Sequence, residues 1–290
     1  MRSVSLAVAL LLALAGAAQA QTVCPLKVKA SLDLDMLDSG VVTVPATLDG
    51  KPFHMLVDTG DYFSTVTQRT ATTLGLEEKP SYGDILIGWG GVRIKDFVKL
   101  QNFRVGRMQA DDQVFFVLPG EDPPFDGLFG ADFLYFFDLE FDFEQARLDL
   151  ISPDHCKGVV VSWTKQPYAA IPFDYRSRKI RLDVTLDGKE VQAILDTGAS
   201  DTVLSLEKAA DLFDLDEDAL AKEAHHPFKN LSMGGVGVNN PVIELVPDKQ
   251  SGLALMGGPK MIIGMNVLRQ LHLYIAYHEG MIYATPAAAR

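Results

Sequence analysis

The chain carries one sequence pattern twice, and this repeat constrains its fold more than any other feature. Leu-Asp-Gly-Lys at residues 48–51 recurs at 186–189, and Asp-Thr-Gly at residues 58–60 recurs at 196–198. Both motifs are displaced by the same 138 positions, so they belong to one repeated unit. A chain of 290 residues is long enough for two domains that each bury a core. We therefore expect two copies of one structural unit.

A second motif extends the repeat toward the end of each half. Residues 128–134 match residues 262–268, with two apolar residues followed by glycine in both. Short β-type runs closed by Asp-Gly turns are a strong hairpin signal. Each copy is therefore expected to run hairpin, Asp-Thr-Gly strand, short helix, glycine-bearing hairpin and final hairpin. The expected strands are 41–48 and 180–186, the helices 68–76 and 205–213 with a possible second helix at 214–224, and the final hairpins 139–151 and 273–284.

The first 20 residues have the pattern of a secretory signal peptide. Arg2 supplies a positive charge, residues 6–15 are apolar or small, and residues 18–20 form a small-x-small cleavage pattern. The apolar run is too short to cross a bilayer. We expect a secreted protein, with a bacterial periplasm as the simplest compartment and no membrane insertion after cleavage. The expected division is a signal peptide at 1–20, an N-terminal lobe at 21–156 and a C-terminal lobe at 157–290.

The chain has two cysteines, Cys24 and Cys156. In an oxidising compartment an isolated pair usually forms a disulfide. Such a bridge would join the start of the first half to a point just past its end. Two free buried thiols are the alternative.

Charge and histidine spacing argue against several kinds of partner. The formal net charge is −12, and nucleic acids and anionic membranes would be repelled by it. The six histidines lack the spacing of a zinc-binding helix, and the acidic residues at 33–38 lack the final glutamate of a calcium loop. We expect no nucleic-acid partner, no metal and no cofactor.

Two Asp-Thr-Gly turns can create acid–base chemistry if they meet. A carboxylate beside a glycine-bearing turn is held rigidly, and two facing turns would bring Asp58 and Asp196 within hydrogen-bond reach. Like charges at that distance cannot both ionise, so one pKa should fall and the other rise. The pair could then act as base toward a water and as acid toward an amide. Two unrelated turns are the alternative, because aspartate and glycine are common turn residues.

The motifs resemble those of a known family. Residues 196–204 resemble the active-site loop of retroviral aspartic proteases, and residues 262–268 resemble that family's second, glycine-bearing signature. The whole chain resembles two retropepsin domains joined in tandem, as in bacterial aspartyl-protease-family proteins. The resemblance implies a mostly β fold of two retropepsin-like (acid protease) β-barrel lobes with an inter-lobe cleft, a peptide or protein substrate, and a monomer. It implies catalytic Asp58 and Asp196, with loop support from Thr59, Gly60, Thr197, Gly198 and Ala199.

The family also has a flap, a glycine-tipped hairpin that closes over the substrate. Two glycine-rich segments, 87–92 and 232–237, resemble it, because glycine permits the backbone geometry of such a tip. Trp89 would cover an apolar substrate side chain, or else belong to the core. The candidate flap residues are Trp89, Gly90, Gly91, Met233, Gly234 and Gly235.

The first Asp-Thr-Gly loop departs from the family pattern. Asp61 follows Gly60 where the family has Ala, Ser or Thr, and aligning Thr65 with Thr202 gives this loop one extra residue. A third carboxylate would raise the pKa values of the pair or hold one aspartate neutral, unless Asp61 turns toward solvent. The family's arginine after the second-motif glycine is also absent, replaced by Ala131 and Met265.

The sequence favours an active aspartic endopeptidase. It leaves open a protease fold that binds peptides without cutting them, and a protein whose lobes pair between chains.

Overall fold

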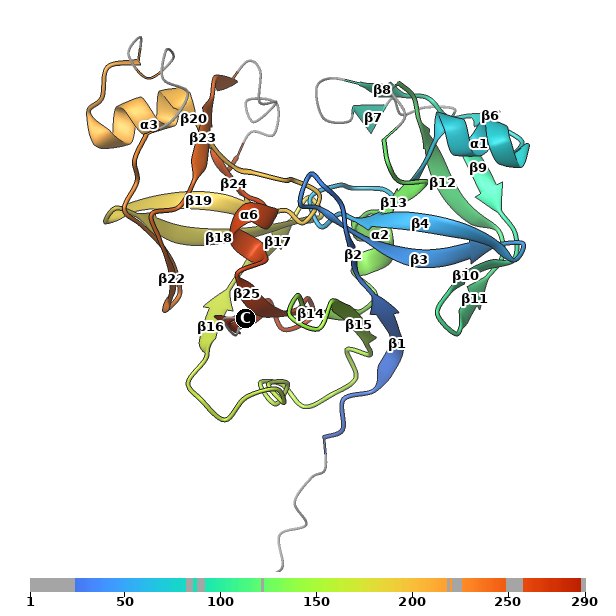
Figure 1. Cartoon of the computed structure of the whole chain (residues 1–290), viewed down its shortest axis with the longest axis horizontal. Helices are drawn as coiled ribbons and strands as arrows, with labels where there is room; N and C mark the ends of the chain where they lie inside the picture. Colours follow the sequence, from blue (N-terminus) through green and yellow to red (C-terminus); the bar gives the residue numbers. More distant parts are fainter. Residues whose placement is uncertain are drawn as a thin grey trace, which may run out of the picture.

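The computed structural model of the chain describes residues 24–81, 86–87, 92–120, 123–217, 220, 226–248 and 258–287. The chain forms two curled β lobes that lie side by side above a shared sheet (Figure 1). This confirms the prediction of a mostly β protein with two barrel-like lobes in tandem.

The N-terminal lobe is a ten-stranded sheet in the order β11-β10-β3-β4-β13-β5-β12-β9-β6, with β2 beside β3. A separate hairpin, β7–β8, lies at the top of this lobe in Figure 1. The strands are β2 (Asp35–Met36), β3 (Val42–Leu48), β4 (Lys51–Val57), β5 (Thr65–Thr67), β6 (Lys79–Pro80), β7 (Leu86–Ile87), β8 (Arg93–Ile94), β9 (Asp96–Leu100), β10 (Phe103–Val105), β11 (Met108–Ala110), β12 (Gln113–Leu118) and β13 (Gly127–Phe129).

The C-terminal lobe repeats this arrangement in an eight-stranded sheet, β22-β21-β18-β19-β24-β20-β23, with β17 beside β18. Its central strands β18, β19, β24 and β20 correspond to β3, β4, β13 and β5 of the other lobe. The strands are β17 (Asp174–Arg176), β18 (Lys179–Leu186), β19 (Lys189–Leu195), β20 (Thr202–Ser205), β21 (Asn230–Met233), β22 (Val236–Asn239), β23 (Ile243–Val246) and β24 (Met261–Ile263).

The repeated Asp-Gly dipeptides form the tight turns that the sequence predicts. Asp49 and Gly50 have φ of 51° and 77°, and Asp187 and Gly188 have φ of 44° and 80°. Two consecutive positive φ values match the twist of the flanking strands, and this places β3–β4 and β18–β19 in the same register.

In each lobe a short helix follows β5 or its counterpart β20, and another follows the glycine motif. The first two begin at hydroxyl caps, because Thr67 accepts the N–H of Thr70 and Ser205 accepts that of Lys208, both at 3.1 Å. The second predicted helix at 214–224 falls largely outside the described residues. The helices among the described residues are α1 (Gln68–Leu74), α2 (Ala131–Leu134), α3 (Leu206–Phe213) and α6 (Met265–Leu268).

A six-stranded sheet joins the lobes, with three strands from each half in the order β1-β15-β14-β25-β26-β16. Its centre is the antiparallel pair β14–β25, in which Leu139 opposes Ile275. One hydrophobic core includes side chains from both halves, so the lobes are packed as a single body. The strands are β1 (Val28–Asp33), β14 (Asp138–Asp142), β15 (Arg147–Ile151), β16 (Ala169–Pro172), β25 (Leu271–Ala276) and β26 (Met281–Pro286).

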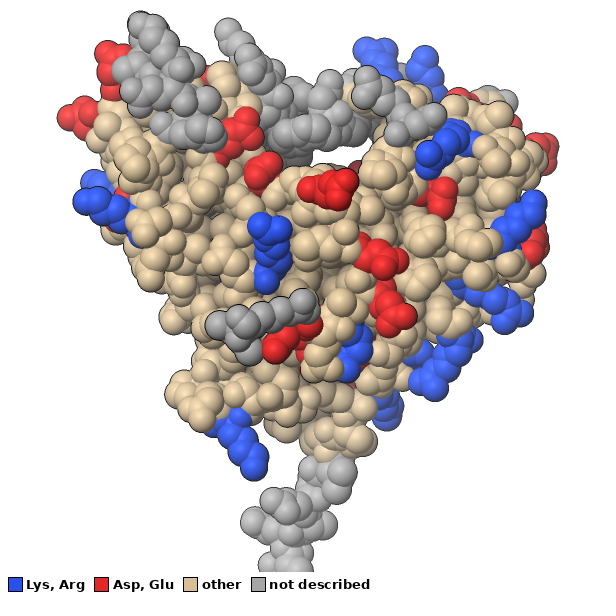
Figure 2. All heavy atoms as spheres, viewed as in Figure 1, with Lys and Arg blue, Asp and Glu red and all other residues tan. Residues whose placement is uncertain are grey.

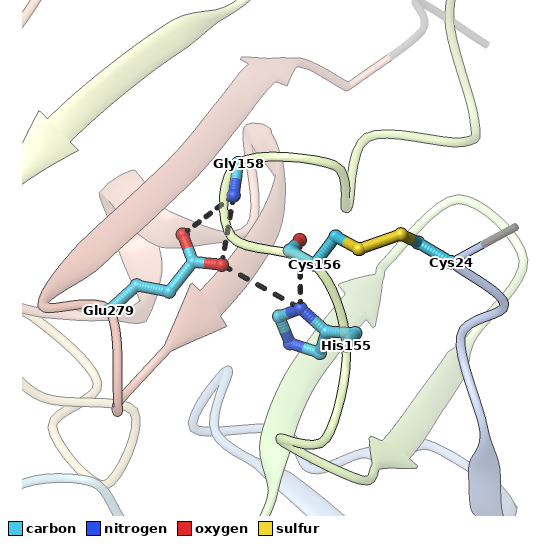
Figure 3. The surroundings of a disulfide bond; sticks show 5 residues. All are labelled: Cys24, His155, Cys156, Gly158 and Glu279. Carbon is cyan, nitrogen blue, oxygen red and sulfur yellow. Dashed lines mark hydrogen bonds and ion pairs between the residues drawn. A yellow bond between two sulfur atoms is a disulfide. The ribbon is translucent and has the colours of Figure 1, made fainter. Parts of the chain in front are cut away.

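Cys24 and Cys156 form a disulfide with their Cα atoms 5.5 Å apart, as predicted (Figure 3). The segment after β15 that holds Cys156 is also tied to the C-terminal half. The N–H of Gly158 donates to the carboxylate of Glu279 at 3.0 Å, and Nδ1 of His155 lies 3.6 Å from the same carboxylate. The bridge therefore fastens the start of the chain to the segment that crosses between the halves.

The surface agrees with the acidic composition. Acidic side chains gather where the two lobes meet on the face shown in Figure 2. Within the described residues, the helices are all too short or too polar to span a bilayer.

Removing the disulfide should destabilise the fold. The bridge closes a loop over a sequence separation of 132, so its loss increases the freedom of the unfolded chain. A Cys24→Ser/Cys156→Ser variant should lose about 2–5 kcal/mol of unfolding free energy in urea denaturation. The oxidised wild type treated with a reductant should show a similar loss, and an unchanged urea midpoint in both would contradict the prediction.

Candidate active site

Each Asp-Thr-Gly turn follows the end of a central strand. Asp58 comes directly after β4 and Asp196 directly after β19, and these strands run parallel to β13 and β24. The N–H of Asp58 donates to the carbonyl of Phe129, and that of Asp196 to the carbonyl of Ile263, each at 3.0 Å. The last backbone hydrogen bond of each parallel strand pair therefore fixes the point where the aspartate leaves the sheet.

The two turns are joined by reciprocal hydrogen bonds between Thr59 and Thr197. The N–H of Thr59 donates to Oγ1 of Thr197 at 3.1 Å, and the N–H of Thr197 donates to Oγ1 of Thr59 at 3.0 Å. Each hydroxyl then donates across to the other lobe, Thr59 to the carbonyl of Leu195 at 3.0 Å and Thr197 to that of Val57 at 2.6 Å. Both threonines are buried, so these bonds are shielded from water. The structure therefore brings Thr59 and Thr197, two of the residues expected to support the loops, into direct contact.

Glycine at the third position of each turn is required by the opposite carboxyl group. The N–H of Gly60 donates to Oδ1 of Asp58, and that of Gly198 to Oδ1 of Asp196, both at 2.8 Å. A Cβ atom on Gly60 would overlap the carboxyl group of Asp196, and one on Gly198 would overlap that of Asp58. Each aspartate therefore projects over the turn of the other lobe, and the two carboxyl groups face each other.

Desolvation raises the pKa of both carboxyl groups. The pKa of Asp58 is raised well above its ordinary value, first by burial and then by the negative charges of Asp196 and Asp61. The pKa of Asp196 is also raised by burial, while the positive charge of Lys179 and hydrogen bonds from Gly198 and Asp58 act against the rise. Both pKa values are therefore raised, whereas the sequence predicted that one would fall, because burial penalises the charged form of each group. Both side chains still keep some exposed surface, which a water or a substrate would need.

The second motif braces each turn from behind. A Cβ atom on Gly130 would strike the backbone of Phe63, and one on Gly264 would strike the backbone of Asp201. The neighbouring polar side chains form matching bonds, since Ser64 donates to Asp132 and Thr202 donates to Asn266, both through their hydroxyls at 2.7 Å. Aligning the two copies of the motif places Asp132 opposite Asn266, so this pair could have been found from the sequence.

These bonds correct the predicted extra residue in the first loop. Ser64, and not Thr65, occupies the place of Thr202, because Ser64 bonds to Asp132 as Thr202 bonds to Asn266. The displacement of 138 positions therefore holds through both loops without an insertion. Two adjacent hydroxyl residues, at 64 and 65, made the wrong alignment possible.

Asp61 occupies the place of Ala199 in the other lobe. Its carbonyl accepts the N–H of Ala131 at 3.0 Å, and the carbonyl of Ala199 accepts that of Met265 at 2.8 Å. The Asp61 side chain is half-buried, and its carboxylate accepts the N–H of Tyr62 at 2.6 Å. Its negative charge raises the pKa of Asp58 and of Asp196, in each case after larger causes led by burial. The third carboxylate thus acts on the pair.

A cationic hairpin tip of the C-terminal lobe touches the first loop, which the sequence did not indicate. Ser177 and Arg178 form the β17–β18 turn with φ of 51° and 54°. Nη1 of Arg178 donates to the carbonyl of Tyr62 at 3.2 Å, and the guanidinium lies 4.9 Å from the centre of the Phe63 ring. No motif marks this contact, because it depends on how the lobes pair.

The two predicted flap segments have different outcomes. Trp89, Gly90 and Gly91 lie outside the described residues, although β7 and β8 on either side pair as a hairpin. Met233, Gly234 and Gly235 end the β21–β22 hairpin, whose strand β21 pairs with the outer side of β18. Gly234 packs against Ile171 of β16, on the side of the inter-lobe sheet. The structure therefore does not bring this second segment to the aspartates, and its assignment as a flap is wrong.

A hollow of about 350 Å³ lies away from the aspartate pair. It is lined by strands of the inter-lobe sheet and the segment between the lobes, including Asp142, Trp163 and His272. Neither Asp58 nor Asp196 lines it, so this hollow does not mark the aspartate pair.

Comparison with known families agrees with the geometry. A sequence model described as aspartyl protease matches residues 44–133 and 182–267, which together make up more than half of the chain. The chain belongs to the aspartyl protease family. Each match covers one Asp-Thr-Gly turn and one glycine motif, so the predicted tandem, retropepsin-like organisation is confirmed. No curated protein matches the chain.

Removing one cross-linking hydroxyl should weaken the contact between the lobes. Thr197→Val leaves the buried N–H of Thr59 and the carbonyl of Val57 without their partner, which should cost about 1–3 kcal/mol of unfolding free energy. Thr197→Ser keeps the hydroxyl and should remain close to wild type in the same denaturant titration. Thr72→Val, which removes an exposed hydroxyl, is the matched control. Equal losses in all three variants would refute the assigned role.

The raised pKa of Asp58 predicts a pH-dependent stability. A carboxyl group with a raised folded-state pKa stabilises the fold at low pH, and that contribution is lost as pH rises through the folded pKa. Asp58→Asn should therefore be more stable than wild type at pH 7, with a smaller advantage at pH 4. Thermal melts across this range test it, with exposed Asp183→Asn as control. An advantage that does not change with pH would contradict the prediction.

Proposed function

We propose that the protein is an aspartic endopeptidase that hydrolyses peptide bonds with a water activated between Asp58 and Asp196. The observation that carries this proposal is the reciprocal packing of the two turns, in which each carboxyl group lies over the glycine of the other lobe. An arrangement that serves only to turn the chain has no need for two carboxyl groups pressed together.

The chemistry follows from one proton shared by two carboxyl groups. The ionised aspartate takes a proton from the attacking water, while the protonated one donates to the carbonyl oxygen of the peptide. The resulting tetrahedral species then breaks its C–N bond as the leaving nitrogen receives a proton from one carboxyl group. A hydroxyl of that species returns its proton to the other carboxyl group as the C=O bond re-forms, which restores the single shared proton. The two pKa values measured would belong to the pair.

The substrate and the compartment are part of the proposal. The substrate would be an extended peptide or an unfolded protein segment that lies between the lobes, over the two aspartates. A single chain supplies both carboxyl groups, which supports a monomer. Export to an oxidising compartment such as the periplasm is supported by the disulfide, because such bridges persist where thiols are oxidised.

A second candidate is a peptide-binding protein without turnover. The observation that favours it is Asp61, a third carboxylate where the other lobe has Ala199. A further negative charge beside the pair would hold both aspartates protonated to higher pH, and a fully protonated pair cannot activate water.

Digestion of a denatured protein mixture at several pH values from 3 to 7 separates the candidates. Wild type should cut best at acidic pH, and Asp196→Asn should lower the rate by about 100- to 10,000-fold because one acid–base partner is removed. Asp183→Asn, on the exposed face of β18, should leave the rate unchanged.

Calorimetry with peptides completes the test. Saturable binding without cleavage at any pH would favour the non-cutting candidate, and neither binding nor cleavage would overturn both. Sedimentation velocity should show one chain per particle if the monomer assignment is correct.

A further inference from the structure

The two lobes differ in charge at two matched positions around the aspartate pair. Asp61 of the first lobe corresponds to Ala199, and Lys179 of the second lobe corresponds to Val41, each displaced by 138 positions. The strand registers agree with this alignment, since Thr43 opposes Leu56 where Arg181 opposes Ile194. At these two positions each lobe contributes a charged side chain that the other lacks, and the two charges have opposite sign.

Lys179 is held in an unusual place for a lysine. It is the first residue of β18, directly after the tight turn that contains Arg178, and only 5% of its surface is exposed. Its Nζ atom lies 4.7 Å from the centre of the Tyr62 ring, in the first lobe. Within the part of the chain that the structure describes, this ammonium forms no salt bridge. A buried charge is costly unless other charges compensate for it.

The compensating charges are the carboxyl groups of the site. The ammonium group of Lys179 lies over the ring of Tyr62, which directly follows Asp61 and belongs to the same loop as Asp58. Arg178 keeps this loop against the hairpin through the Tyr62 carbonyl and the Phe63 ring. Lys179 is therefore fixed beside the loop that carries two of the three carboxylates.

We propose that Lys179 is a positioning residue of the site, whose ammonium offsets the negative charge of Asp61 so that Asp58 and Asp196 share a single proton. This inference rests on the proposed peptidase function. It also answers the observation that favours a non-cutting protein, because the third carboxylate has a cationic counterpart.

The other groups facing the pair are consistent with this role. The charge of Lys179 lowers the pKa of both aspartates, and the charge of Asp61 raises both, so the two substitutions act in opposite directions. Tyr277 also faces Asp58, but burial raises the pKa of its hydroxyl well above the ordinary value, so it stays neutral. Arg178 lowers the pKa of Asp132 and of Tyr175, both of which burial raises.

A cycle of variants tests the inference. Lys179→Met removes the charge at similar side-chain length, Asp61→Ala introduces the residue of the other lobe, and the double variant removes both charges. Carboxyl ¹³C NMR of labelled aspartates, with Asp58→Asn and Asp196→Asn for assignment, reports the apparent pKa values without any turnover.

The expected shifts have opposite signs. Lys179→Met should raise the apparent pKa values of the pair by about one unit, Asp61→Ala should lower them, and the double variant should return toward wild type. Lys179→Arg keeps the charge and should remain near wild type, while exposed Lys189→Met is the matched control. Unchanged pKa values in Lys179→Met would overturn the inference, even if that variant were less stable. If Lys179→Met does not fold, unchanged values in Asp61→Ala would overturn it equally.

The pH dependence of peptide hydrolysis tests the peptidase function and the role of Lys179 separately. If wild type cuts and the acidic limb of its profile moves to higher pH in Lys179→Met, both proposals are supported. If wild type cuts and the limb does not move, only the role of Lys179 fails. If wild type does not cut but the NMR shifts appear, the peptidase proposal fails while the charge compensation stands.

Discussion

The structure depends on the reciprocal hydrogen bonds between Thr59 and Thr197. These bonds lie where the lobes meet. The same two hydroxyl groups also donate to the opposite lobe, that of Thr59 to the carbonyl of Leu195 and that of Thr197 to the carbonyl of Val57. Each carbonyl belongs to the last residue of the strand that delivers the opposite aspartate. The separation of the two carboxyl groups is thus set by bonds to the strand ends, and every other contact of the site is built around that fixed distance.

Two kinds of support act on this centre. The parallel pairs β4–β13 and β19–β24 hold each turn from its own lobe, with Gly130 and Gly264 allowing close packing behind it. The inter-lobe sheet holds the lobes to each other through β14 and β25. The contacts within each lobe orient its carboxyl group, and the shared sheet keeps the two carboxyl groups pointing toward each other.

Much of the fold was predictable because its information is local and duplicated. The Asp-Gly turns and the Asp-Thr-Gly turns each follow from a few adjacent residues, and their repetition strengthened the prediction. Other features could not be predicted because they need tertiary pairing. A Gly-Gly tip indicates a hairpin, but only the pairing of β21 with β18 shows that the tip at Gly234 faces β16. Lys179 belongs to no motif, and its relation to the first loop exists only in the assembled lobes.

The six-stranded sheet limits how the two halves can exist. Separating them would leave β14 paired only with β15 and β25 paired only with β26, and it would expose the backbone donors and acceptors of both new edges, which favours pairing with other chains. A half chain of this kind would either find a second copy of itself or aggregate. Fusion of the halves removes that hazard, and it also frees each lobe to change its own residues without the same change appearing in the other.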